Sequence, residues 1–237
     1  MRAIIILSIV LSQLNVYSTD IMGFTTKANA FLVRYVSNGL VDYGAIKKDP
    51  SDADNLYQQI GNMNLDNTDA TTRKAFYINA YNIVVIYAVV RAMPIKSPME
   101  VPGFFDGLKH RVAGEDLTLN ELENKKLRQA YKDGRIHFAL ACAAQSCPPL
   151  ASFAYTGERI EDQLRERTAL TLNKKEWIRL HPAQKKVEVS KIFEWYKEDF
   201  ISAGNPPLGW INQFRKEKIP LSFAVGFYEY NWTLNRK

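Results

Sequence analysis

The stretch RKAFYINAYNIVVIYAVVRAM, residues 73–93, decides the fold of this chain. It is apolar on most of its sides, which is typical of a helix enclosed by the rest of a protein. Pro94 follows it. Proline lacks a backbone N–H group and clashes with the preceding turn, so the helix ends there. We therefore predict a central helix around which the other elements pack.

The segments on either side of this stretch predict more helices than strands. HRVAGEDLTL (110–119) predicts a hairpin that turns at Gly114. No repeated strand–helix–strand pattern is present, so we predict the α+β class, with a mainly helical body packed around a small, largely antiparallel sheet. The other helices that we predict lie over 22–38, from residue 51 onward, and over 118–131, 157–172, 191–203 and 207–216. The other predicted strands lie at 135–142, at 185–190 and within 221–234.

Length and composition indicate one soluble globular domain after an export signal. The chain has 237 residues, of which 46% are hydrophobic and 24% charged, the ordinary balance of such proteins. MRAIIILSIVLSQLNVYSTD (1–20) has one basic residue, then an apolar run too short to span a bilayer comfortably, and small residues before a cleavage site at Ser18. We predict a signal peptide over 1–18, a single domain over 19–237, and a periplasmic or secreted location.

The formal net charge of +6 does not indicate a nucleic-acid-binding protein. Basic residues lie among acidic ones in runs such as ENKKLRQAYKDGR (123–135), and no RNA-binding signature is present. Such a basic surface is typical of a solvated face that can contact an anionic envelope surface. We expect a monomer whose partner is an unknown small molecule or peptide.

Both cysteines lie in RIHFALACAAQSCPPL (135–150), together with one of the three histidines. If this segment begins as a strand, His137 shares a face with alanines. These small residues either leave room beside the ring, as in a pocket wall, or let a helix pack closely while His137 hydrogen-bonds across the sheet. The two prolines after Cys147 keep that residue out of a helix, so its sulfur lies on a stiff loop.

Four interpretations of this segment stay open. In the first, Cys147 is a nucleophile and His137 its base, since a nearby imidazole favours the thiolate. In the second, Cys142 and Cys147 form a disulfide, which is usual for two cysteines in an exported protein. The third interpretation is a zinc site, for which the segment supplies three ligands whereas a structural site needs four. In the last interpretation the two cysteines are reduced, buried and inert. We predict no metal and no cofactor.

Asn79 and Asn82 interrupt the apolar stretch and share one face of the predicted helix. A buried amide must find hydrogen bonds. The pair therefore either holds loop backbone or lines a polar cleft that faces the cysteine segment. Tyr81 is a candidate for the same cleft, because a tyrosine hydroxyl serves as donor or acceptor.

In IFEWYKEDF (192–200), Trp195 and Asp199 are four residues apart. A carboxylate beside a tryptophan can have a raised pKa and act as an acid. The alternative is a helix with its aromatic residues inside and its acids in water. Elsewhere the chain lacks a nucleotide-binding glycine loop, a nucleophile elbow, a helical zinc pair and a calcium loop, which disfavours several common enzyme classes.

Several segments together resemble the family known as domain of unknown function 547, in the family's order and across nearly all of the predicted domain. The segment with His137, Cys142 and Cys147 is specific to that family. The matching segments are VDYGAI (41–46), KAFYINAYNIVVIYAV (74–89), LTLNELENKKLR (117–128), RIHFALACAAQSCPPL (135–150), VSKIFEWYKEDF (189–200) and YNWTLN (230–235).

The resemblance implies no particular reaction. Bacterial members of the family often bear export signals, which agrees with residues 1–18. A central helix that precedes a histidine-bearing strand is loosely similar to papain-like and transglutaminase-like folds. Those folds begin the central helix with the nucleophilic cysteine, whereas this helix offers Asn79 instead.

Two functional hypotheses follow. The first is a thiol-dependent hydrolase or transferase with Cys147 as nucleophile, His137 as base, and Asn79 or Asn82 orienting the ring or holding substrate. The second is a non-catalytic binding module whose loop is closed by a Cys142–Cys147 disulfide. Both place the site in a cleft between the central helix and the cysteine segment.

Overall fold

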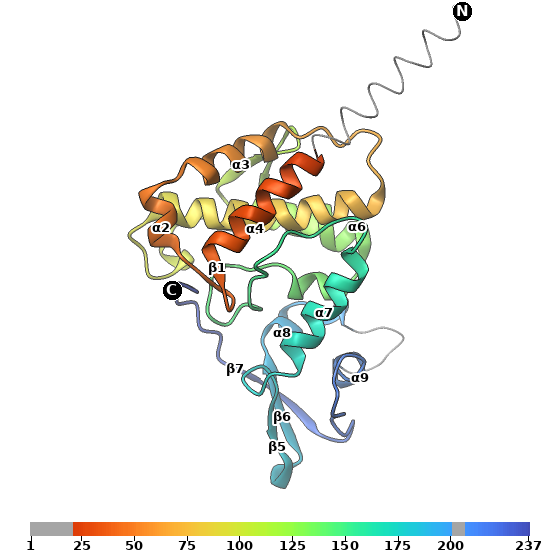
Figure 1. The fold of residues 1–237 in the computed structure, drawn as a ribbon. Coiled ribbons are helices and arrows are strands. Elements are labelled where there is room, and N and C mark those ends of the chain that lie inside the picture. The colour runs from red at the N-terminus through yellow and green to blue at the C-terminus, as the bar shows by residue number, and fades with distance from the viewer. Residues whose placement is uncertain (1–20, 201–206) are drawn as a thin grey trace, which may run out of the picture.

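The computed structural model describes residues 21–200 and 207–237, so the predicted signal peptide lies outside the described residues. The fold is α+β, as predicted. Figure 1 shows a helical part that contains α2 (Tyr43–Lys48), α3 (Ser51–Asn62) and α4 (Ala70–Ala92). The strands β5 (Arg179–His181), β6 (Lys186–Ser190) and β7 (Ala224–Tyr228) form the opposite end of the molecule.

The central helix predicted from the sequence is α4. Its first turn is capped by Asp69, whose carboxylate accepts from the Thr72 N–H at 2.9 Å. Nearly every side chain from Lys74 to Val90 is buried. Within the described part of the chain, α4 alone is long and apolar enough to cross a membrane, but 83% of its most apolar window is buried. It is therefore the core helix of this domain.

Shorter elements cover α4. Residues 21–35 are helical and lead into an antiparallel pair, β1 (Val36–Ser37) and β2 (Leu40–Val41). The predicted hairpin is present as β3 (Lys109–Val112) and β4 (Glu115–Thr118), and Gly114 adopts a φ of 82° at its turn. Next comes a continuous helical segment made of α5 (Leu119–Glu121), the π-helical η2 (Leu122–Arg128) and α6 (Gln129–Tyr131).

The strands of the described residues form three small sheets, whereas we expected one. Two are antiparallel pairs, and in the third β5 pairs antiparallel with β6 but β6 pairs parallel with β7. Parallel pairing needs a long connection, and here it contains α8 (Ile192–Trp195), η5 (Lys197–Asp199) and α9 (Pro207–Asn212). The other elements are η1 (Pro98–Glu100), η3 (Gly134–Phe138), α7 (Ile160–Leu172) and η4 (Pro182–Gln184).

The strand expected at 135–142 is wrong. Residues Gly134–Phe138 form the 3₁₀ helix η3, and an irregular segment follows. Asp133 starts this helix, because its carboxylate accepts from the Arg135 N–H at 3.1 Å. Residues 136–141 are all buried rather than buried on alternate sides. A short, wholly buried run does not distinguish a strand from a helix by its periodicity.

The single helix expected over 191–203 is also wrong. The chain makes one turn in α8, breaks at Tyr196, and makes a 3₁₀ turn in η5. Residues 201–203 lie outside the described part. As a result Trp195 and Asp199 do not share a helix face, and the two side chains reach different parts of the protein.

Candidate functional site

The asparagines of α4 hold two loops by pairing with their backbone. Asn82 donates to the Ala139 carbonyl at 2.8 Å and accepts from the Ala141 N–H at 2.9 Å. Asn79 makes the equivalent pair with the carbonyl and N–H of Tyr155, each at 2.8 Å. Each amide thus satisfies loop carbonyl and N–H groups that a neighbouring β-strand would otherwise pair. Both side chains are buried and bond loop backbone through nitrogen and oxygen, so they hold loop backbone and do not line a cleft, which was our other interpretation.

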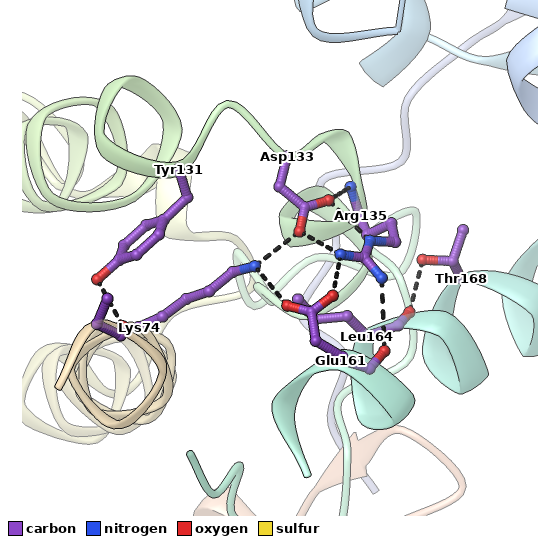
Figure 2. Close-up of polar contacts among 8 residues, drawn as sticks. Lys74, Tyr131, Asp133, Arg135, Glu161, Leu164 and Thr168 are labelled. Atoms are coloured by element: carbon purple, nitrogen blue, oxygen red, sulfur yellow. Dashed lines mark hydrogen bonds and ion pairs between the residues drawn. The ribbon is translucent and has the colours of Figure 1, made fainter. Parts of the chain in front are cut away.

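A charged network fixes η3 between α4 and α7 (Figure 2). Lys74 of α4 lies 2.7 Å from Asp133, and Asp133 also accepts two hydrogen bonds from the Arg135 guanidinium, at 2.8 and 2.7 Å. Arg135 in turn contacts Glu161 of α7 at 2.6 Å. The Lys74 side chain is only 6% exposed. Burial raises the pKa of Asp133, but hydrogen bonds from Arg135 and Lys74 outweigh burial and lower the pKa below its ordinary value.

This anchoring places His137, the fourth residue of η3, between two carboxylates. Its Nε2 lies 2.7 Å from Asp199 Oδ2, and its Nδ1 lies 3.8 Å from Glu123 Oε1. Gly134 permits the close approach of the Asp199 segment, because a Cβ there would lie 2.7 Å from the Asp199 carbonyl oxygen. An ionised carboxylate only accepts, so Nε2 carries the proton and Nδ1 is the nitrogen left for acid–base work.

Asp199 stays ionised. Burial raises its pKa, but hydrogen bonds from His137 and Arg128 outweigh burial and lower the pKa to about 2. Arg128 Nε donates to it at 2.6 Å. Of our two interpretations of Trp195 and Asp199, the one with a raised carboxyl pKa and an acid role is therefore wrong. The Asp199 side chain lines one polar cavity and orients the imidazole ring of His137. Trp195 lines a different cavity, which His137 also lines.

The lowered pKa of Asp199 predicts a pH-dependent stability. A carboxyl group whose pKa falls on folding stabilises the protein above its ordinary value of 3.8, and this stabilisation is lost as the pH falls toward 2. We expect Asp199→Asn to be less stable than the wild type at pH 6, with a difference that shrinks between pH 4 and about 2. Urea unfolding across this range measures it. Exposed Asp66→Asn is the control, and a difference independent of pH would contradict the assignment.

Cys142 and Cys147, the two cysteines of the chain, form a disulfide with their Cα atoms 6.1 Å apart. The second interpretation of the cysteine segment is thus the one the structure has. The Cys142 N–H points at Cys147 Sγ, with a distance of 2.8 Å. The Tyr230 hydroxyl lies 3.2 Å from Cys142 Sγ and 3.3 Å from Cys147 Sγ. Cys147 is 6% exposed and Cys142 is half-buried.

Residues 230–235 reach the disulfide because they run beside the cysteine loop. The N–H groups of Gln145 and Ser146 donate to carbonyls of Thr233 and Asn231, and the Asn235 N–H donates to the Ala143 carbonyl. The exposed side chain of Asn231 also bonds Gln145. The closing segment therefore builds one wall of the site.

The disulfide and His137 face one cavity of about 530 Å³, here called the disulfide cavity. One wall is an aromatic platform in which Tyr230 packs against Trp195 and Trp232, with ring centroids 4.9 and 4.7 Å away. Trp195 is 46% exposed. The other residues that line the cavity include Tyr81, Met99, Phe105, Asp106, Asn120, Glu123, Leu140, Pro148, Ile192 and Tyr196.

Three tyrosine hydroxyls of the disulfide cavity stay protonated and act as donors. Burial raises the pKa of Tyr81 well above its ordinary value, and the neighbouring Glu123 carboxylate raises it further. The same two causes raise the pKa of Tyr196. Burial also raises the pKa of Tyr230, whose hydroxyl meets the sulfurs. The cavity thus joins neutral donors, a buried carboxylate and an oriented imidazole.

Of the residues we selected from the sequence, the cavity brings together Tyr81, His137, Cys142, Cys147 and Trp195. Sequence reasoning missed Glu123 and the tyrosine and tryptophan side chains that complete the wall. Glu123 was hidden in a mixed-charge run that is typical of a solvated helix. Among the described residues, no cluster of three or more possible metal ligands occurs. The residues missed are Glu123, Tyr196, Tyr230 and Trp232.

Residues 65–170 match the family model described as "Protein of unknown function, DUF547". These residues form a DUF547 family domain, as the resemblance of the sequence predicts. The match includes α4, Glu123, His137 and both cysteines. No curated protein and no solved structure matches the chain. The segments at 41–46, 189–200 and 230–235, which we also compared with the family, lie outside the matched range.

Proposed function

We propose that this chain is an exported, monomeric binding protein that takes a small molecule or peptide into the disulfide cavity. The observation that carries the proposal is the composition of that cavity, an aromatic platform beside a few polar groups. Ligand sites commonly have this mixture, in which apolar surface gives affinity and polar groups give orientation. The apolar segment at 1–18 and the disulfide support export.

The cavity favours a ligand with a flat ring or apolar side chain next to a polar group. Trp195 and Met99, two of the exposed large apolar side chains, both lie on its rim. His137 and Glu123 lie where a hydroxyl, amide or amine of the ligand would meet them. The formal net charge of +6 supports contact with an anionic envelope surface, and no nucleic-acid partner is proposed.

We expect ligand-observed saturation-transfer NMR to detect binding of N-acetyl tryptophan amide, N-acetyl tyrosine amide or N-acetylglucosamine to the full chain. Trp195→Ala should weaken binding roughly fivefold or more, since a buried aromatic contact at an interface costs more than about 1 kcal/mol when truncated. Leu180→Ala, another exposed apolar side chain, is the matched control. Binding that is unaffected by Trp195→Ala, or no transfer to any of the three probes, would contradict the proposal.

A thiol-dependent hydrolase or transferase is the second candidate. One observation favours it, namely that Cys147 and His137 line the same cavity. Its nucleophile would be the Cys147 thiolate, with His137 Nδ1 as base. In the structure the Cys147 sulfur is bonded to Cys142. This candidate therefore requires reduction of the bridge before the reaction, which the binding function does not.

A further inference from the structure

We propose that the Cys142–Cys147 bridge is a reactive disulfide that oxidises a peptide dithiol bound in the disulfide cavity. This inference rests on the proposed binding function and names its ligand, a peptide with cysteines next to an aromatic side chain. The first observation is location. The bridge lies in the wall of a cavity of about 530 Å³ rather than inside the core. A purely structural bridge needs no such access.

The two sulfurs differ in a way that suits exchange. Cys142 is the more exposed of the two residues, which favours its sulfur as the one that a substrate attacks. Cys147 is then the leaving group, because the Cys142 N–H points at its sulfur at 2.8 Å; the Tyr230 hydroxyl lies 3.2 Å from Cys142 Sγ and 3.3 Å from Cys147 Sγ, within reach of the leaving thiolate. Donors to a sulfur favour its thiolate form, and a leaving thiol of lower pKa leaves faster.

The cavity also holds an acceptor for the proton of the attacking thiol. Asp199 fixes the proton of His137 on Nε2, which leaves Nδ1 free to take a proton. Glu123 lies 3.8 Å from Nδ1 and balances the charge of the imidazolium that forms. His137 and the sulfurs line the same cavity. The same imidazolium can later return the proton to Cys147.

The reaction is a two-step exchange. A substrate thiolate attacks Cys142 Sγ, which forms a substrate–Cys142 disulfide and breaks the bridge, and the electron pair of the bridge leaves on Cys147 Sγ. The second substrate thiolate then attacks the substrate sulfur of this mixed disulfide and releases Cys142 as a thiolate. The peptide dithiol loses two electrons and two protons, and the cysteine pair gains both.

The aromatic platform selects the substrate. Tyr230 contacts both sulfurs with its hydroxyl and packs its ring on Trp195 and Trp232. A peptide side chain stacked on Trp195 therefore lies beside the disulfide. A peptide cysteine adjacent to a tryptophan or tyrosine is delivered to Cys142, whereas a small thiol without a ring gains no such positioning.

The test is a single-turnover reaction of the full, unreduced chain with a short peptide in which two cysteines flank a tryptophan. We expect it to react at least about tenfold faster than the same peptide with alanine in place of tryptophan. Tyr230→Phe should slow the reaction about tenfold, because it loses a hydrogen bond to the leaving thiolate. Tyr131→Phe, which removes a hydroxyl far from the sulfurs, is the matched control.

A one-cysteine version of the peptide locates the attack in the unsubstituted protein. After quenching with N-ethylmaleimide, mass spectrometry should find the peptide on Cys142 and the maleimide on Cys147. Attack at Cys147, equal rates for the two dithiol peptides, or two free thiols before peptide is added would overturn the inference. A serine version of the peptide separates the two proposals. If the serine peptide binds but the cysteine peptide does not react, the exchange proposal is refuted and the binding function stands. If neither peptide binds, the binding function is refuted as well.

Discussion

Asp133→Ala should lower the free energy of unfolding by about 3–5 kcal/mol, since it removes one partner of a buried ion pair. The variant leaves the Lys74 ammonium 6% exposed, with Glu161 at 3.4 Å as its remaining carboxylate partner among the described residues. Glu161 is 61% exposed and compensates poorly. The substitution also removes the carboxylate that starts η3. Urea unfolding of the two proteins at neutral pH measures the loss.

A double variant separates the buried charge from the lost cap. Lys74→Met in the Asp133→Ala background removes the unpaired ammonium, so the double variant should be more stable than Asp133→Ala alone. Asp52→Ala is the matched surface control, because Asp52 pairs with Arg34 at 3.2 Å where both side chains are more than half exposed. It should cost at most about 1 kcal/mol. Equal losses for Asp133→Ala and Asp52→Ala would refute the role of the buried pair.

Asn82→Ala is expected to cost about 2–5 kcal/mol, because it leaves the Ala139 carbonyl and the Ala141 N–H buried without partners. The effect should also be local. Hydrogen exchange should speed up at Ala141 and through the cysteine loop more than in the strands β5, β6 and β7. Mass spectrometry of peptic fragments after exchange reads out both regions in one experiment.

Two further variants sharpen this test. Asn82→Asp keeps an acceptor for the Ala141 N–H but places a second acceptor against the Ala139 carbonyl, so it should also destabilise the protein. Asn55→Ala, on the exposed side of α3, removes an asparagine that holds no loop backbone and should cost less than about 1 kcal/mol. A uniform rise in exchange across the whole chain would mean that Asn82 does not hold the loop specifically.

Elements defined by local chemistry were predictable from the sequence. The apolar stretch that became α4, the hairpin with Gly114, and the capping box of Thr118 and Glu121 all follow from neighbouring residues. The 3₁₀ form of η3 did not follow, because it depends on Lys74 and Glu161, which are distant in the sequence. Wholly buried residues carry no periodicity that would have revealed it.

The site was predictable only in part, for the same reason. His137 and the cysteines share one short segment, but the sequence did not show whether the chain turns back to bring them to one cavity, as it does in the structure. Glu123 and Tyr230 come from other elements, and only the packed fold brings them to that segment. The asparagine pair was visible in the sequence, but its role was not. Its spacing indicated a shared helix face, but whether Asn79 and Asn82 met loop backbone or an open cleft depended on where residues 139–155 run.

Formation of the disulfide and pairing of residues 230–235 with the cysteine loop occur at different times as the chain folds. Cys142 and Cys147 are five residues apart and can meet as soon as both have been made. Tyr230, whose hydroxyl contacts both sulfurs, is 83 residues further along than Cys147. Contacts between distant segments form late, because a long loop must close first. The bridge can therefore form before its cavity exists, and docking of residues 230–235 then places the Tyr230 hydroxyl against both sulfurs.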